Sequence, residues 1–202
     1  MFKNKYPGKF IAIEGLDGSG ASTQTARIAD HFKTGKKSFW TTQEPTSSVI
    51  GGIIKSSLTG DWKMVNPYSL QLLFAADRAN HLTKDIIPRL TKGLTVITDR
   101  YFLSSLAYGS LDINDDDWLY NINSQFILPD LTILLKVSPK VCLTRIKDNR
   151  QSLELFEQAE KLQKVWRAYE LLSKKYPGIK VIDGEKPEKE VFEEIIREVS
   201  NL

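Results

Sequence analysis

Five short apolar runs alternate along the chain with segments in which apolar residues recur at a helical period. The predicted strands are Phe10–Glu14, Ser38–Thr42, Leu94–Asp99, Leu131–Val137 and Ile179–Asp183. The predicted helices include Thr23–Phe32, the long segment Tyr68–Leu90, Val141–Lys147 and a charged helix that continues to about Lys174. Strands that alternate with helices predict an α/β fold, a doubly wound five-stranded parallel sheet with helices on both faces. Since no repeat or linker interrupts the pattern, we expect residues 1–202 to form a single domain.

Residues that favour helix ends sharpen some of these boundaries. Asn66-Pro67 is typical of an N-cap followed by proline in the first helical turn. Asn114 precedes three aspartates, 115–117, which we interpret as acids at the positive end of a helix rather than as metal ligands. His31 and His81 have no ligand-like spacing, so we interpret both as residues on helix surfaces.

Composition narrows the class of protein without identifying it. The chain has 202 residues and a formal net charge of +3, too small for the strongly basic face that extended nucleic-acid binding requires. Its single cysteine, Cys142, lies in an apolar run and cannot form an internal disulfide, so we expect a core residue and a reducing compartment. No signal peptide and no membrane-spanning run is evident. These features favour a cytoplasmic enzyme that does not bind membranes.

The first predicted strand leads into a glycine-rich turn and then a helix, which is the context of the phosphate-binding motif G-x-x-x-x-G-K-[ST]. Gly15, Gly20 and Ser22 have the right spacing, but Ala21 occupies the lysine position. Backbone N–H groups and the helix dipole still favour an anion there, because they belong to the main chain. The loop therefore predicts nucleotide binding, whereas catalysis needs independent support.

Ligands of such sheets bind at the carboxyl ends of the strands. That rule groups the glycine-rich loop with Glu44-Pro45-Thr46, Asp99-Arg100-Tyr101 and Asp183-Gly184-Glu185. A carboxylate at Asp99 is either a ligand that holds Mg²⁺ through water or simply a turn former. The Arg100 guanidinium is suited to a phosphate, and the alternative is an ion pair with Asp99 or Asp17.

Phe74 and Arg78 are four residues apart in the long predicted helix and therefore share a face. An aromatic ring beside a guanidinium can stack on a base and bind its carbonyl edge. The alternative is that Phe74 belongs to the core and Arg78 to the surface.

A basic cluster, Arg145, Lys147 and Arg150, precedes Gln151-Ser152. Such a run is typical of a solvated charged face. The second interpretation is a basic lid over a triphosphate, at about residues 145–156, which the missing loop lysine favours. Arg150 is then the first candidate to replace that lysine, followed by Arg145 and Lys147.

Taken together, these segments resemble the thymidylate kinase family from about Lys9 to the C-terminus. The matching segments are residues 14–20, 44–46, 73–81, 99–108, 129–132, Arg145, 150–157 and 181–184. The resemblance implies a P-loop kinase fold, transfer of the γ-phosphoryl group of ATP to dTMP with Mg²⁺ as cofactor, and a homodimer.

The resemblance also implies a role for each matching position. Residues implied to bind the ATP phosphates are Gly15, Leu16, Asp17, Gly18, Ser19, Gly20, Ala21, Ser22, Thr23 and Arg145. Residues implied to bind the substrate are Glu44, Pro45, Phe74, Arg78, Arg100, Ser104, Ser105 and Tyr108. In the family the matching phenylalanine stacks on thymine, the first arginine binds the edge of the base, and the tyrosine packs under the deoxyribose. Asp17, Arg100 and Arg150 are the catalytic candidates, and Ser22, Asp99 and Asp17 are the candidate metal ligands.

The chain departs from the family pattern at three positions, Ala21, Gln43 and Gly109. We expect the change at position 21 to affect the rate and the change at position 43 to affect the affinity for the acceptor. The change at position 109 should have little effect. Two alternatives stay open: a nucleotide-binding protein with weakened catalysis, and a kinase for another monophosphate such as dUMP.

Overall fold

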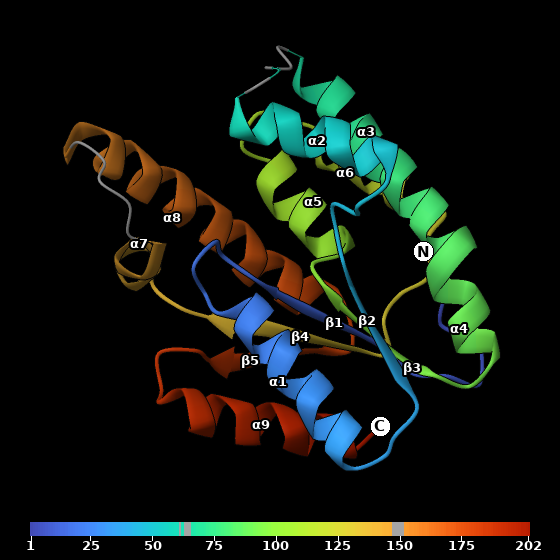
Figure 1. Ribbon diagram of the computed structural model, residues 1–202. Helices are drawn as coiled ribbons and strands as arrows, with labels where there is room; N and C mark the ends of the chain where they lie inside the picture. Colours follow the sequence, from blue (N-terminus) through green and yellow to red (C-terminus); the bar gives the residue numbers. More distant parts are fainter. Residues whose placement is uncertain (61, 63–65, 147–151) are drawn as a thin grey trace.

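The structure is a computed structural model that describes residues 1–60, 62, 66–146 and 152–202, with the backbone alone for 152–158. A sheet lies between two layers of helices (Figure 1). Its strands are β1 (Phe10–Gly15), β2 (Phe39–Gln43), β3 (Thr95–Asp99), β4 (Leu131–Lys136) and β5 (Ile179–Asp183). The α-helices are α1 (Ala21–Thr34), α2 (Val49–Thr59), α3 (Pro67–His81), α4 (Ile87–Thr91), α5 (Phe102–Gly109), α6 (Asp116–Asn123), α7 (Pro139–Ile146), α8 (Ser152–Lys175) and α9 (Glu188–Ser200).

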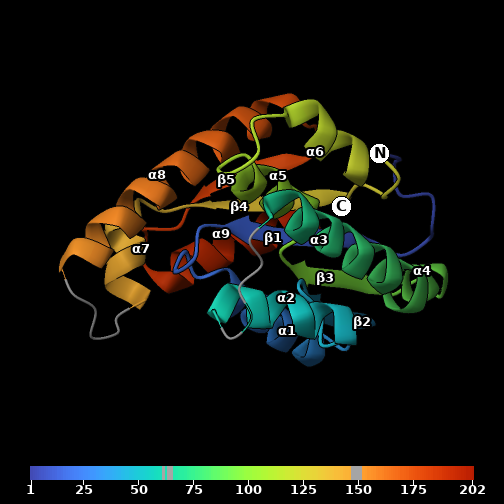
Figure 2. The same ribbon diagram turned by 90° about the horizontal axis from the view of Figure 1, so that it is seen from above.

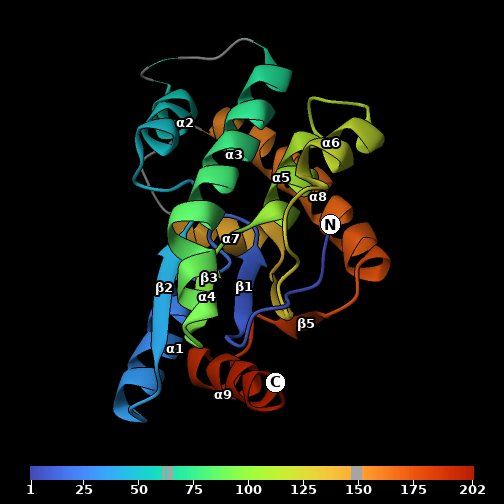
Figure 3. The ribbon, with the colours of Figure 1, turned by 90° about the vertical axis from the view of Figure 1, so that its right-hand side faces the viewer.

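The sheet has the order β2-β3-β1-β4-β5, and all four strand pairs are parallel. Ile13 pairs with Asp99, which pairs in turn with Gln43, so β1, β3 and β2 end at the same edge. Figure 3 shows these carboxyl ends directed toward α2, α3 and α5. The predicted doubly wound parallel sheet is confirmed, and each strand lies within one residue or so of its predicted bounds.

Side chains of β1 alternate between the two faces, as a fully covered strand requires. Ile11 and Ile13 pack with residues of α1 and α9, whereas Phe10 and Ala12 pack with residues of α5 and α8. Figure 1 shows α1 and α9 on one face and α3, α5 and α8 on the other. In Figure 2, α8 extends from α7 along α5, which matches their contacts. Cys142 is fully buried, as predicted.

The long predicted helix is not one regular α-helix. α3 ends at His81, a π-helical segment covers Leu82–Ile86, and α4 begins at Ile87. Pro88 accounts for the break, because its missing N–H and its ring interrupt the hydrogen bonding of the preceding turn. Asn66 caps α3 as predicted, with its side chain accepting a hydrogen bond from Ser69 N at 3.2 Å.

The acids at 115–117 lie at the N-terminus of α6 as predicted, and Asp115 is the N-cap, which accepts from Trp118 N at 2.9 Å. One local prediction was wrong. His81 is not on the surface, since it is 2% exposed and lies 2.7 Å from Thr42 Oγ1. That position follows from the tertiary contact of α3 with β2, which the helical period does not reveal. His31 is exposed, as predicted.

Candidate active site

The glycine-rich loop connects β1 to α1 through two glycines in the left-handed region. Gly18 has a φ of 81° and Gly20, the N-cap of α1, a φ of 96°. A Cβ atom at Gly18 would lie 2.5 Å from the carbonyl oxygen of Cys142, so close packing on α7 also requires glycine there. The first turn of α1 carries no acidic residue, which leaves the positive end of the helix available to an anion.

A cavity of about 590 Å³ lies at this helix end. It is lined by Leu16, Asp17, Gly18, Ser19, Gly20, Ala21, Ser22, Thr23, Gln24, Asp99, Arg100, Arg145, Gly184, Lys186, Glu188 and Val191. We call it the donor cavity. Of the positions implied to bind ATP phosphates, all but Gly15 line it.

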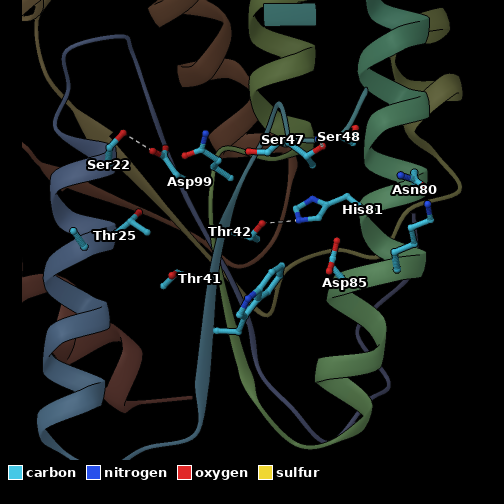
Figure 4. A pocket seen from close by; sticks show the side chains of 15 residues that line it. Ser22, Thr25, Thr41, Thr42, Ser47, Ser48, Asn80, His81, Asp85 and Asp99 are labelled. Carbon is cyan, nitrogen blue, oxygen red and sulfur yellow. Dashed lines mark hydrogen bonds between the residues drawn. The ribbon is translucent and has the colours of Figure 1, made fainter. Parts of the chain in front are cut away.

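Ser22 and Asp99 meet at the edge of the donor cavity. The Ser22 hydroxyl donates a hydrogen bond to Oδ2 of Asp99, which joins α1 to the end of β3. Figure 4 shows the two side chains pointing toward each other at one end of a neighbouring groove that Gln43 also lines. Within the described part of the chain, no cluster of three or more His, Cys, Asp or Glu residues could hold a metal. A hydroxyl and one carboxylate suit Mg²⁺, which keeps several waters and binds substrate phosphates.

Arg100 links the loop to β3. Its φ of 69° is unusual for a residue with a side chain, and such backbones are often held at functional sites. Nη2 lies 2.5 Å from Oδ1 of Asp17, and Nη1 donates to Gly15 O and to Ser104 Oγ, both at 3.1 Å. The ion pair with Asp17 is therefore confirmed. Both partners also line two cavities, so the pair lies where those cavities adjoin.

The second cavity has a volume of about 180 Å³. It is lined by Asp17, Glu44, Pro45, Leu58, Leu70, Gln71, Phe74, Arg78, Arg100, Tyr101, Ser104, Ser105, Tyr108, Leu111, Asp112 and Lys161. We call it the acceptor cavity. It brings together all eight positions that the resemblance implies for substrate binding.

Arg78 is one of the most buried side chains in the described residues, with 1% exposure, so the surface interpretation was wrong. Its Nε donates to Glu44 Oε2 at 2.8 Å and its Nη2 to Ser105 Oγ at 2.9 Å, while Nη1 donates to Asn123 Oδ1. Glu44 also lies 3.0 Å from His81 Nδ1. This network fixes the guanidinium at the wall of a cavity that the half-buried Phe74 also lines.

A buried carboxyl, Glu14, lies under the site at the end of β1. Its oxygens accept from Tyr101 N at 2.9 Å, from the hydroxyl of Ser104, and from Tyr169 OH at 3.2 Å. Burial raises the pKa of Glu14 to about 7. The hydrogen bond from Ser104 and the charge of Arg100 lower this pKa, but their effect is smaller than that of burial. Since Tyr169 belongs to α8, Glu14 connects that helix to the loop strand.

Tyr108 lies beside the ion pair of Asp17 and Arg100. Its hydroxyl accepts a hydrogen bond from Asp17 N at 3.1 Å, and the Arg100 guanidinium is 5.4 Å from the ring centre. Burial raises the pKa of Tyr108 above its ordinary value, so the phenol stays neutral near pH 7.

Arg145 lies beside the donor cavity as predicted. Its Nη1 donates to Ser19 O at 3.2 Å and its Nη2 to Gly184 O at 3.0 Å, which joins α7 to the loop and to the end of β5. Of the predicted lid, residues 147–151, which include Lys147 and Arg150, fall outside the described residues; 145–146 end α7 and 152–156 begin α8.

Sequence reasoning missed three residues. Lys186, three positions after β5, lines the donor cavity, and extending the strand-end rule by one more residue would have found it. Gln71 lines the acceptor cavity on the helical face of Phe74 and Arg78, three and seven positions before them. Asn123 binds Arg78 from α6, and no sequence signal marks such a long-range contact.

The glycine-rich loop lines one cavity, and the adjoining second cavity is lined by an aromatic ring and a buried guanidinium. Together with the strand order, this arrangement defines the class of P-loop kinases. A sequence model of the thymidylate kinase family matches residues 13–195. The chain belongs to the thymidylate kinase family.

Individual relatives agree with this assignment. The chain is 38% identical to a probable thymidylate kinase of Pyrococcus horikoshii, over 94% of both chains. It is 38% identical to a probable thymidylate kinase of Methanocaldococcus jannaschii, over 96% of both. It is 36% identical to a thymidylate kinase of Carboxydothermus hydrogenoformans, over 93% of this chain and 95% of the relative.

Proposed function

We propose that this chain transfers the γ-phosphoryl group of ATP to dTMP, giving dTDP and ADP. The observation that carries the proposal is the shared wall of the two cavities, where Asp17 and Arg100 line both. Donor and acceptor phosphates bound on either side would meet at the Arg100 guanidinium. The thymidylate kinase relatives support the choice of substrates.

In this proposal the chain acts by positioning and by neutralising charge, which phosphoryl transfer chiefly requires. The main chain of residues 15–23 holds the ATP phosphates. Arg100 draws the acceptor phosphate into line, and no general base is needed because that phosphate is already an anion. The base lies against Phe74 with its edge at Arg78, and Tyr108 packs under the sugar. Ser104 and Ser105 keep the two arginines in place through their hydroxyl groups.

Mg²⁺ is part of the proposal. Ser22 and Asp99 would hold it, with Asp17 near its phosphate ligands. These residues fit Mg²⁺ because they offer oxygen ligands. The Ser22 hydroxyl and a carboxylate oxygen of Asp99 contact each other at the edge of the donor cavity. When bound, Mg²⁺ would neutralise charge on the β- and γ-phosphates.

Ala21 favours one other candidate, a protein that binds both nucleotides without transfer. A coupled assay with ATP, Mg²⁺ and a panel of dTMP, dUMP, dCMP, dAMP and dGMP tests the choice. We expect turnover with dTMP above all others. Binding of ATP and dTMP without turnover would support the binding protein, and preference for another monophosphate would reassign the substrate.

The proposal extends to assembly, domain and location. Exposed apolar residues gather on α2 and α3, among them Val49, which is 82% exposed, and Leu72, which is 52% exposed. These helices contact each other and offer a face for a second copy of the chain (Figure 3). Residues 1–202 act as one kinase domain. A lone, buried cysteine suits a reducing compartment and supports a cytoplasmic location as part of this proposal.

A further inference from the structure

The buried carboxyl of Glu14 is not used by the proposed reaction, and its hydrogen bonds indicate what it does instead. Glu14 is fully buried near the end of β1 and is not among the described residues that line the donor cavity or the acceptor cavity. Burial of a carboxyl group is unfavourable unless hydrogen bonds compensate for the lost water. Among the described residues, the partners of Glu14 come from α5, from its N-cap and from α8.

Glu14 caps α5 from a neighbouring strand. α5 begins at the edge of the sheet where β1 and β3 end (Figure 3). Its N-cap residue, Tyr101, donates its hydroxyl to Ile127 O at 3.0 Å, so that side chain does not cap the helix. Instead, Oε1 of Glu14 accepts from Tyr101 N at 2.9 Å and from Ser104 N at 3.3 Å. A capping box satisfies the same two N–H groups, at the N-cap and at the third helical residue, with side chains of the helix itself. Here β1 supplies the acceptor.

This cap fixes the backbone of Arg100, the residue just before the N-cap. Arg100 has a φ of 69°, and a residue with a side chain keeps such a backbone only where its surroundings hold it. Arg100 N donates to Ile13 O at 2.9 Å, and Arg100 O accepts from Thr98 Oγ1 at 2.8 Å. The next amide, Tyr101 N, is the one that Glu14 binds. Consecutive residues of β1 therefore hold the N–H groups on both sides of the Arg100 Cα atom.

The same carboxyl also orders the Arg100 side chain, through Ser104. The Ser104 hydroxyl donates to Oε2 of Glu14, which leaves its lone pairs for Nη1 of Arg100 at 3.1 Å. Tyr169 OH lies 3.2 Å from the same Oε2 and 2.9 Å from Ser104 Oγ, so α8 also contributes to this group. Without the carboxyl, the Ser104 hydroxyl would lose the acceptor that fixes its rotation.

We propose that Glu14 is a positioning residue, which holds Arg100 at the wall between the two cavities by capping α5 and by orienting Ser104. Glu14 acts through the fork of donors that Arg100 offers to an anion. The inference deepens the proposed function and rests on it, because it takes Arg100 to bind the acceptor phosphate. Since Phe74 and Arg78 lie on α3, loss of Glu14 should weaken the contact with phosphate and leave binding of the nucleoside part nearly unchanged.

Titration calorimetry with dTMP and with thymidine, which lacks the phosphate, isolates that contact. The parent chain should bind dTMP about tenfold or more tightly than thymidine, as one hydrogen bond between charged groups allows. In Arg100→Ala this ratio should shrink toward one. Glu14→Met accepts from neither N–H group, so the ratio should shrink about threefold or more, while thymidine binds as in the parent.

Further variants separate positioning from stability. Glu14→Asp keeps the charge on a shorter side chain that withdraws from α5, so it should also shrink the ratio, and it carries the test if Glu14→Met does not fold. Glu14→Gln keeps an oxygen for both N–H groups and should retain more of the ratio than either. Ile11→Ala is the matched control. It removes a fully buried side chain of β1 on the face covered by α1 and α9, so it should lower the Tm and keep the parent ratio.

The outcomes distinguish the inference from the proposed function. If Glu14→Met and Glu14→Asp keep the parent ratio while Arg100→Ala loses it, the inference is wrong and the proposed function stands. An equal loss in Ile11→Ala would also overturn the inference, because general destabilisation would then explain the effect. If Arg100→Ala keeps the parent ratio, the proposed position of the acceptor phosphate fails first, and the inference fails with it.

Discussion

Nη2 of Arg100 lies 2.5 Å from Oδ1 of Asp17, and this ion pair joins the end of β3 to the glycine-rich loop at the wall shared by both cavities. Arg100→Lys keeps the charge but loses the fork that also binds Gly15 O and Ser104. We expect kcat to fall about 10²-fold or more, with ATP affinity nearly intact.

A double-mutant cycle with Asp17→Asn checks that the two residues act together. The losses in kcat/KM should be far from additive, because each substitution breaks the same pair. Independent, additive losses would mean that the ion pair does not position Arg100 for catalysis.

Asp99 should control the metal requirement. Its contact with the Ser22 hydroxyl places two oxygen atoms at the edge of the donor cavity. Asp99→Asn removes the negative charge there, so the Mg²⁺ concentration for half-maximal rate should rise about tenfold or more. Asp30→Asn, exposed on α1 away from the cavities, is the control. A normal Mg²⁺ titration for Asp99→Asn would reduce Asp99 to a structural role.

Glu14 should make stability depend on pH. Burial raises its pKa from 4.5 to about 7, so between these values the folded chain holds a proton that the unfolded chain has lost. The contribution of Glu14 to the stability of the folded chain is complete below its unfolded pKa of 4.5. It is lost as the pH rises through the folded pKa of about 7. Its size is on the order of 3 kcal/mol.

Thermal unfolding of Glu14→Gln and the parent chain measures this effect. Between about pH 5 and about pH 8, the Tm of the parent should fall relative to that of the variant, whose amide does not titrate. Parallel pH profiles for the two proteins would show that Glu14 is ionised throughout.

A homodimer should form through α2 and α3. Within the predicted partner face Leu70–Ala76, only Leu72 and Ala76 are exposed. Leu70 and Phe74 line the acceptor cavity instead. Leu72→Glu places a charge on this apolar face, so light scattering at micromolar concentration should report a dimer for the parent and a monomer for the variant. Leu171→Glu on α8, 70% exposed in the parent, should stay dimeric. A monomeric parent would end this part of the proposal.

The absence of a lysine at Ala21 should limit the rate. Loss of a cation that stabilises a transferring phosphoryl group costs about 10³–10⁵ in rate, or roughly 4–7 kcal/mol. Arg100 and Arg145 both hold main-chain carbonyls of the loop, whereas Lys186 lines the donor cavity and pairs with Glu194 at 3.2 Å on the surface of α9. A surface pair is weak, so Lys186 is free to turn toward phosphate.

Three variants separate the candidates for that charge. Ala21→Lys should raise kcat, and Lys186→Met should lower it by about tenfold or more if its ammonium replaces the lysine. Lys189→Met, an exposed lysine of α9 that lies outside the cavity, is the control. Full activity in Lys186→Met together with loss in Arg150→Ala would assign the role to Arg150, as the sequence alone predicts.

Local patterns predicted most of the fold. Alternating apolar runs placed the strands, and the carboxyl-end rule grouped Asp17, Asp99 and Arg100 correctly because parallel strands end at one edge. The pairing of Phe74 with Arg78 also follows from helical spacing alone. The resemblance to the family supplied the rest of the candidate residues.

What the sequence did not reveal depends on contacts between distant elements. His81 and Arg78 are buried because Glu44, after β2, and Asn123, on α6, provide their partners. Neither periodicity nor composition encodes that arrangement. Gln71 was missed for a related reason, since an amide on a helix is usually exposed, whereas here Gly109 lies opposite it, where a Cβ atom would come within 3.1 Å of Gln71 Cδ.

Rapid-quench single-turnover measurement with γ-labelled ATP, Mg²⁺ and dTMP tests the central claim most directly. The account predicts that label moves from ATP to dTDP in the parent chain, and that Arg100→Lys slows this step rather than nucleotide binding. The account is contradicted if the parent chain, saturated with both nucleotides, forms no labelled dTDP.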